Sequence, residues 1–278
     1  MFTQKSARRR ALLIAPVLAL VALFLLGAGG PAGAKLQAGE GPRPTIVLVH
    51  GDWADGSSWT SVIERLQHRG FTVVAPPNLL RGPAADSAYL ASYLQTISGP
   101  IVLVAHSYGG FVITNAATGN TNVKALVYID SFMPDEGESL GTLAASSGSC
   151  IDDSALNAVP YDGRVDLYLR WEANPPDPGF IECFANGVGP KTAAVLAAVQ
   201  RPAAAAQFGE SSGPPAWKTI PSWSLIGTLD HVIPPALQEE MSSRAGARIS
   251  RVRAGHLTPI TRPAHVTKVI LSAIHATT

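Results

Sequence analysis

The sequence has few charged residues, and basic and acidic ones are nearly equal in number. Charged side chains make up 15% of the 278 residues and hydrophobic ones 46%, which excludes a disordered chain and predicts a sizeable core. Four of the 21 basic residues and none of the 20 acidic ones lie in residues 1–34, so the remainder carries a net charge near −3. Because nucleic-acid binding requires a basic surface, we expect no nucleic-acid partner.

Cysteine is scarce, and the usual cofactor motifs are missing. Cys150 and Cys183 are the only cysteines, and neither has the spacing of a metal ligand. The sequence also lacks a P-loop, a dinucleotide-binding fingerprint, a zinc-binding motif and any internal repeat. We therefore expect no cofactor and no bound metal. The two cysteines either form a disulfide, which an oxidising compartment would permit, or remain two buried thiols.

The N-terminus has the parts of an export signal. Arg8–Arg10 precede the apolar run Ala11–Gly27, and Ala32–Ala34 supplies the small residues of a cleavage site. We predict a cleaved signal peptide over residues 1–34 and a linker over residues 35–44, so that the protein is secreted or retained in the cell envelope. The alternative is an uncleaved N-terminal helix that anchors the protein, since the run approaches the length of a membrane span.

After the linker, strands alternate with helices, which is typical of an α/β sheet. The predicted strands are Thr45–His50, Phe71–Ala75, the run from Pro100 to Ser107, Val123–Ile129, Ser222–Gly227 and Arg248–Val252. The predicted helices are Trp59–His68, Asp86–Ile97, the segment after Ser107 to about Ala117, Pro234 or Pro235 to Arg244, and Pro263 to about His275. Continuous apolar strands such as the first indicate a parallel sheet that is buried on both faces.

The alternation stops over residues 133–217, which are rich in Gly, Pro, Ser and Ala and contain one predicted helix at Lys191–Gln200. A loop of this length without structure is improbable inside a compact domain. We therefore predict a small, mostly helical cap insertion that covers the carboxyl edge of the sheet. The core is then residues 45–132 and 218–278, a mostly parallel sheet flanked by helices.

A sharp turn between a strand and a helix places Ser107 at its apex. Ala105-His106-Ser107-Tyr108-Gly109 differs from the G-x-S-x-G nucleophile elbow only by alanine in place of the first glycine. Such a turn projects the serine hydroxyl away from both elements, and the glycine after it lets helix and strand pass closely. The motif predicts a nucleophilic serine.

Serine needs a base within hydrogen-bond reach and a group that orients the base. Ser107, Asp230 and His256 each follow a predicted strand, in the chain order nucleophile, acid, histidine. We predict that His256 accepts the serine proton and that Asp230 holds the imidazole tautomer. Asp130 also ends a strand, and it remains an alternative for the acid.

Acyl transfer also needs donors for the oxyanion, and the fold would supply the backbone amides of Tyr108 and Asp52. The carboxylate of Asp52 would oppose a developing oxyanion unless it turns away. Gly51 lets this loop approach the substrate, and we expect Gly51, Trp53 and Trp171 to line the substrate pocket.

These motifs resemble the α/β-hydrolase superfamily. The matching segments are Val47–Gly51, Ala105–Gly110, Gly227–Pro234 and Gly255–His256. Two further segments, His50–Trp59 and Asp130–Pro134, are similar to its methylesterase and hydroxynitrile-lyase branch. The likeness covers roughly Thr45 to Ile274 and is weakest through the cap. It implies the α/β-hydrolase fold and a carboxylesterase activity with a serine triad.

This chain differs from the lyases of the branch at two positions, which favours hydrolysis over cyanohydrin cleavage. Plant lyases of this branch have a threonine at the position of Gly51 and a lysine at that of Leu257, and related enzymes with an aspartate nucleophile differ from this chain at Ser107. The expected partner is a small-molecule ester, with no stable membrane association if the signal is cleaved; the oligomeric state is left open. The alternatives are a hydroxynitrile lyase, an acyltransferase or a ligand-binding protein that lacks activity.

Overall fold

The structure is a computed structural model that describes residues 42–145, 147–171 and 179–277. The predicted signal peptide, residues 1–34, and most of the predicted linker, residues 35–44, lie outside the described residues. Within the described part of the chain, no helix is both long enough and apolar enough to cross a membrane.

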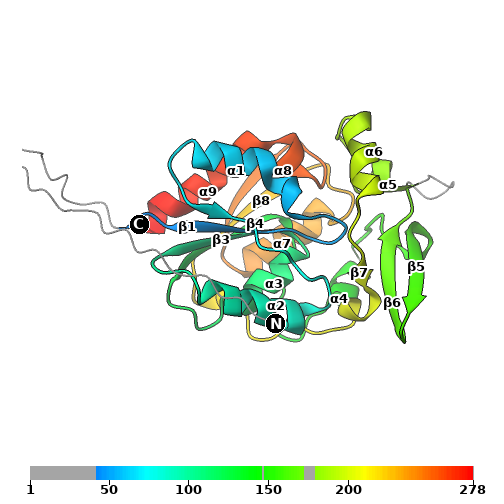
Figure 1. Cartoon of the computed structure of the whole chain (residues 1–278), viewed down its shortest axis with the longest axis horizontal. Coiled ribbons are helices and arrows are strands. Elements are labelled where there is room, and N and C mark those ends of the chain that lie inside the picture. Colours follow the sequence, from blue (N-terminus) through cyan, green and yellow to red (C-terminus); the bar gives the residue numbers. More distant parts are fainter. Residues whose placement is uncertain (1–41, 146, 172–178, 278) are drawn as a thin grey trace, which may run out of the picture. The chain divides into compact units, whose positions relative to one another are not determined.

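A six-stranded parallel sheet with the order β2-β1-β3-β4-β8-β9 forms the core (Figure 1). The strands are β1 (Thr45–Val49), β2 (Val73–Val74), β3 (Ile101–Ser107), β4 (Val123–Ser131), β8 (Ser222–Gly227) and β9 (Arg248–Val252). The predicted α/β architecture is confirmed, and β8 and β9 have the predicted bounds. The strand predicted at Phe71–Ala75 is shorter, because only Val73 and Val74 pair with β1.

Both faces of the sheet are covered by helices, which explains why the central strands β1 and β3 are almost entirely apolar. Alternate residues of β1 point to opposite faces, so Ile46 and Leu48 join one apolar cluster whereas Val47 and Val49 join the other. One face is covered by α1 (Thr60–Gln67), preceded by the short helix η1 (Gly56–Trp59), and by α8 (Thr258–Thr261) and α9 (Pro263–Thr277). The other is covered by α2 (Pro83–Leu94), α3 (Gly109–Ala116) and α7 (Pro235–Arg244).

The parallel arrangement brings the carboxyl ends of the strands to one edge. Ser107, the last residue of β3, pairs in register with Ser131, the last residue of β4. Gly227 at the end of β8 pairs with Val252 at the end of β9. The loops that follow these strands therefore meet at this edge, where ligands bind in open α/β sheets.

The segment between β4 and β8 contains short helices, as predicted, and also a three-stranded antiparallel sheet, β5-β6-β7, which the sequence analysis does not predict. Its elements are α4 (Leu140–Ala144), η2 (Asp153–Ala155), β5 (Leu156–Tyr161), β6 (Arg164–Leu169), α5 (Gly179–Cys183), α6 (Pro190–Ala198), β7 (Ala203–Ala204), η3 (Ala205–Phe208) and η4 (Ala216–Lys218). The helix expected at Lys191–Gln200 corresponds to α6.

A sequence signal for the β5–β6 hairpin exists at its turn. Tyr161 pairs with Arg164, so Asp162 and Gly163 form a two-residue loop, and both have positive φ angles of 45° and 71°. An Asp-Gly pair between strands is a strong hairpin signal, because this turn requires positive φ at both positions. The predominantly exposed side chains of β5 lack the alternation that would have drawn attention to it.

Cys150 and Cys183 form a disulfide in this segment, with their Cα atoms 5.8 Å apart. The bridge joins the chain before η2 to the end of α5, and the Cys183 side chain is buried. Of the two alternatives that the sequence leaves open, the structure therefore has the disulfide and not the two buried thiols.

Replacing both Cys150 and Cys183 with serine is expected to lower the free energy of unfolding by about 2–4 kcal/mol, because the bridge closes a loop with a sequence separation of 33. Thermal unfolding of the double variant and of the wild type with and without a reducing agent measures this loss. Unfolding curves that do not respond to reduction would contradict the prediction.

Candidate active site

Ser107 occupies a strained turn between β3 and α3. Its φ angle is +54°, a left-handed value that is unfavourable for a residue with a side chain. A Cβ atom on Gly109 would lie 2.7 Å from the carbonyl oxygen of Val49, and one on Gly110 would collide with the carbonyl oxygen of Phe132. The two glycines therefore let α3 start against the ends of the neighbouring strands.

The structure brings the three residues of the predicted triad together. Ser107 Oγ lies 3.0 Å from Nε2 of His256, and Nδ1 of His256 lies 2.8 Å from Oδ2 of Asp230. All three residues are buried, with at most 4% of their surface exposed. This is the geometry in which an imidazole accepts a serine proton while a carboxylate orients it.

Asp230 is held by donors that its own loop and α7 supply. Oδ1 accepts hydrogen bonds from the amides of Val232 and Ile233, and Oδ2 accepts one from Nε2 of Gln238 at 2.8 Å. Burial raises the pKa of Asp230, while these donors act in the opposite direction. Together with Nδ1–H of His256 they make four donors, and a carboxylate is the form that accepts them all. Gln238 is not predicted from the sequence, because a single buried glutamine in α7 belongs to no motif.

Asp130, the alternative acid, lies beside the triad without contacting its histidine side chain. Its Oδ1 accepts a hydrogen bond from the amide of Gly227 at 2.7 Å, and its Oδ2 accepts from the amide and the hydroxyl of Thr258. Burial raises the pKa of Asp130 well above its ordinary value, and the charge of Asp230 adds to this. Asp130 therefore ties the end of β8 to the segment after His256, which is a positioning role.

The His256 ring is packed and desolvated. His106 donates from Nε2 to the carbonyl oxygen of His256 at 2.9 Å, and its ring centre lies 4.6 Å from that of His256. Phe184 packs on the same imidazole with a centroid distance of 5.3 Å. Asn186 Oδ1 accepts the amide of His256. Burial lowers the pKa of His256 from 6.5 to about 3, so the ring is neutral at neutral pH and available as a base.

The ester hydrolysis that the motifs imply is expected to persist into acidic solution for this reason. The base must be neutral, so activity falls only as the pH drops through the pKa of His256 in the folded protein. Because burial lowers that pKa, we expect the acid limb of the profile of kcat/KM against pH to have its midpoint below 6.5. Initial rates with a p-nitrophenyl ester across the acidic range measure it, and a midpoint at or above 6.5 would contradict the assignment.

The loop after β1 approaches the serine closely. A Cβ atom on Gly51 would lie 2.5 Å from Cβ of Ser107, so the position has no room for a side chain. The next residues are Asp52 and Trp53, and Trp53 has a φ angle of +57°. Tyr108 follows Ser107 as the N-cap residue of α3. The amides of Asp52 and Tyr108 thus stand on the two segments that flank the serine, as expected for an oxyanion site.

One aromatic residue of the predicted pocket lies at the cavity and the other does not. Trp53 is 5% exposed, and its indole donates to the carbonyl oxygen of Leu167 in β6. Its ring packs edge to face on Phe184. Trp171 is 64% exposed, and neither Trp171 nor Gly51 is among the described residues of the cavity wall, so the pocket role expected of these two residues stays a prediction.

A cavity of about 140 Å³ opens at Ser107. Most of its wall is apolar, and its polar lining comes from one serine besides Ser107 and from three aspartates. The lining residues are Asp52, Trp53, Ser107, Phe132, Leu140, Ala144, Ser149, Ile151, Asp152, Asp153, Leu156, Phe208 and Val232. Among the residues that the structure describes, no group of three or more His, Cys, Asp or Glu side chains is arranged to hold a metal ion.

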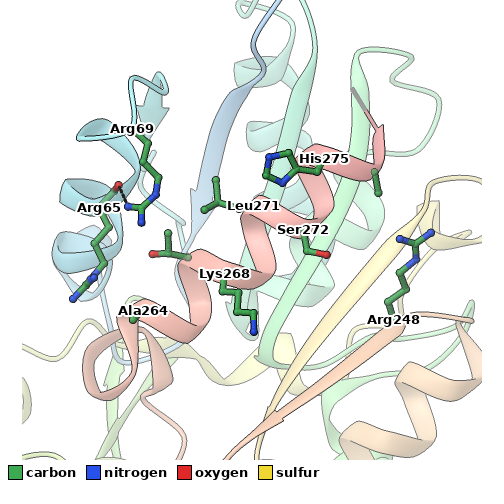
Figure 2. Close-up of a pocket in the computed structure, with 10 residues that line it drawn as sticks. Arg65, Arg69, Arg248, Ala264, Lys268, Leu271, Ser272 and His275 are labelled. Atoms are coloured by element: carbon green, nitrogen blue, oxygen red, sulfur yellow. Dashed lines mark hydrogen bonds between the residues drawn. The ribbon is translucent and has the colours of Figure 1, made fainter. Parts of the chain in front are cut away.

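A wider, open hollow of about 640 Å³ lies near α1, β9 and α9 (Figure 2). Basic side chains line it, with Arg65 from α1, Arg69 from the turn after α1, Arg248 from β9 and Lys268 from α9. Arg248 is the first residue of β9, so this end of the hollow is at the amino edge of the sheet, opposite the edge at Ser107. The hollow is therefore separate from the candidate active site.

Comparison with known families agrees with this fold and geometry. The profile of the alpha/beta hydrolase family matches residues 46–267. The chain belongs to the alpha/beta hydrolase family, as the resemblance of its motifs implies.

The individual proteins that match this chain have low sequence identity to it or match only part of it. The carbendazim hydrolyzing esterase of Nocardioides sp. (strain SG-4G) is 33% identical over 111 residues, which are 35% of this chain and 46% of that protein. The match thus spans about half of that relative's length.

Among solved structures, polyneuridine aldehyde esterase superposes with a TM-score of 0.68 at 18% identity, covering 83% of this chain and 99% of that one. A methylesterase from Arabidopsis also gives 0.68, at 17% identity, with 84% and 99% covered. At these identities the two structures show a shared fold, and the expected likeness to methylesterases is confirmed at that level.

Proposed function

We propose that this protein is a serine hydrolase that cleaves a small carboxylic ester through an acyl-enzyme on Ser107. The observation that carries the proposal is the hydrogen-bonded chain from Ser107 Oγ through His256 to Asp230, which opens on a cavity. Membership of the alpha/beta hydrolase family supports hydrolysis. Two relatives whose names describe esterases support an ester as the substrate.

The first half of the reaction acylates the serine. His256 Nε2 takes the proton of the Ser107 hydroxyl while Oγ forms a bond to the ester carbonyl carbon. The amides of Asp52 and Tyr108 donate to the oxygen that gains the negative charge. When the carbonyl re-forms, the bond to the alcohol oxygen breaks, and His256 returns its proton to that oxygen. Asp230 stabilises the imidazolium throughout and stays ionised.

The second half repeats these steps with water. His256 accepts a proton from water as the water oxygen attacks the acyl carbon, and the same two amides stabilise the second oxyanion. The bond to Ser107 Oγ then breaks, the serine regains a proton from His256, and the carboxylic acid leaves. No cofactor enters either step.

The volume of the cavity limits the size of the substrate group that can fit into it. Its volume of about 140 Å³ is close to the roughly 150 Å³ of an engineered apolar cavity that binds benzene. The group seated in it is therefore small and mostly apolar.

A fluorophosphonate probe tests nucleophile activation without knowledge of the natural substrate. We expect one phosphonyl group per chain, located by mass spectrometry on the peptide that contains Ser107, and loss of hydrolysis of short p-nitrophenyl esters in parallel. An enzyme that hydrolyses these esters but is labelled at a different residue would overturn the proposal. Assays of cyanohydrin cleavage, and of transfer to an added alcohol, distinguish the lyase and acyltransferase alternatives.

We also propose that the protein functions outside the cytoplasm. The charged and apolar segments within residues 1–34 support this, and so does the bridge between Cys150 and Cys183, because disulfides persist mainly in oxidising compartments. Expression of the full chain in a bacterium and mass measurement of the exported product tests it. A product that retains residues 1–34 would favour the anchored alternative.

A further inference from the structure

The cavity wall includes a buried carboxyl oxygen without a hydrogen-bond partner. Asp52 is 4% exposed, and its Oδ2 accepts a hydrogen bond from Nε2 of Gln207 at 2.7 Å. Its Oδ1 is buried and accepts no hydrogen bond from the residues that the structure describes. Burial raises the pKa of Asp52 to about 7, with a contribution from Asp86, while Gln207 lowers it. A buried acceptor without a hydrogen bond raises the free energy of the folded state. We therefore expect a bound molecule to donate a hydrogen bond to Oδ1, because the described residues supply no donor.

Asp52 lies in the wall of the cavity at the proposed nucleophile. It lines the same cavity as Ser107, and it follows Gly51, whose backbone is packed against the serine. Under the proposed mechanism its amide contacts the ester carbonyl oxygen. The carboxyl group on the same residue is therefore within reach of a substituent a few bonds from the reacting carbon.

The other charged groups of the cavity have the same sign. Asp152 and Asp153, at the start of η2, also line it, and no Lys, Arg or His is among the described residues of its wall. Solvent screens these two exposed carboxylates, so the buried Asp52 is the charge by which the cavity favours a positively charged group and opposes a carboxylate.

We propose that Asp52 is a specificity residue that selects esters carrying an N–H donor, in particular a protonated amine, which hydrogen-bonds to its Oδ1. This rests on the proposed ester hydrolysis and names its substrate class. The small apolar remainder of the cavity limits the spacer between the ester and the amine to a few carbon atoms. Pairing with an ammonium group also removes the conflict between the Asp52 carboxylate and the developing oxyanion, because the pair has no net charge.

Matched esters test the proposal. In p-nitrophenyl β-alaninate an ammonium group replaces the terminal methyl of p-nitrophenyl butanoate, and the monoester of succinate carries a carboxylate. On the alcohol side, the butanoate esters of 3-aminopropanol and butanol also differ only by an ammonium group in place of a terminal methyl group. In at least one of the two series we expect kcat/KM to be tenfold or more higher for the ammonium ester than for its isostere, with the succinate ester poorest.

Asp52→Asn keeps the shape and the backbone amide but removes the charge, so the ammonium-to-methyl ratio should fall to near one. Asp153→Asn removes an exposed charge from the same cavity and should change the ratio less than threefold, because solvent screens it. A ratio that is the same in the wild type and in Asp52→Asn, in both series, would overturn the proposal.

Binding of inert analogues separates this inference from the hydrolysis. The amides N-methyl-β-alaninamide and N-methylbutanamide differ only by ammonium against methyl, and NMR titration measures their dissociation constants. We expect the wild type to bind the ammonium compound at least fivefold more tightly, even if no ester is hydrolysed. N-(3-aminopropyl)butanamide and N-butylbutanamide make the same comparison on the alcohol side. Equal affinities within both pairs would assign Oδ1 to a bound water molecule and overturn the proposal, whether or not Asp52→Asn folds.

Discussion

Replacing Ser107 with alanine is expected to lower kcat/KM for p-nitrophenyl butanoate by about four to six orders of magnitude, and to abolish labelling by a fluorophosphonate. Alanine removes the only atom that forms the acyl bond, while His256 and Asp230 keep their mutual hydrogen bond. The remaining rate would come from the oxyanion amides acting on attack by water. So large a loss can be measured only in purified protein, in which the fluorophosphonate probe shows that no host esterase remains.

Ser222→Ala is a matched control. Ser222 is also buried, but it begins β8 at the amino edge of the sheet, where its hydroxyl donates to the carbonyl oxygen of Ile220. We expect this variant to keep its activity within a few fold and to retain the label. If Ser107→Ala loses no more activity than Ser222→Ala, the proposed nucleophile is wrong.

The core of this fold could be predicted from sequence because its strands are buried on both faces. The apolar runs at Thr45, Ile101 and Ser222 each match an observed strand within a residue or two. The sheet then fixes where the ends of these strands meet. The chain order of Ser107, Asp230 and His256 was therefore enough to predict that they converge, although they are separated by more than a hundred residues at the widest.

The elbow tolerates its departure from the usual motif for a local reason. Ala105 is fully buried in β3, where it pairs with Val49 on one side and Tyr128 on the other. The close contacts fall on Gly109 and Gly110, which a Cβ atom would drive into neighbouring carbonyl oxygens. The size of the side chain at position 105, two residues before the serine, is therefore less restricted than at positions 109 and 110.

The segment over the site was harder to predict, because its elements are short and mostly exposed. The strand β5 shows no apolar alternation, and Trp171, which we expect to line the pocket, is 64% exposed. The side chains that complete the site from other elements, Gln238 towards Asp230 and Gln207 towards Asp52, belong to no motif. Such contacts depend on how elements pack, and a single sequence does not encode them in a readable pattern.

Asp230→Asn and Asp130→Asn should have very different effects on activity. An asparagine at position 230 would donate from its amide nitrogen to Nδ1 of His256, which forces the proton onto Nε2. That tautomer cannot accept the proton of Ser107, so we expect kcat/KM to fall by about four orders of magnitude. Steady-state kinetics with the same p-nitrophenyl ester measures both variants.

At position 130, asparagine retains most of the contacts. Its amide oxygen still accepts the hydrogen bond from Gly227, and its NH₂ group can donate to the Thr258 hydroxyl. Only the Thr258 amide loses its acceptor, so two of the three contacts still hold the loop that carries His256. Because burial already favours the uncharged form of Asp130, the loss of its charge costs little. We expect less than a tenfold loss of kcat/KM and a modest fall in melting temperature. A larger loss of activity in Asp130→Asn than in Asp230→Asn, with both variants folded by circular dichroism, would instead make Asp130 the acid that orients the histidine.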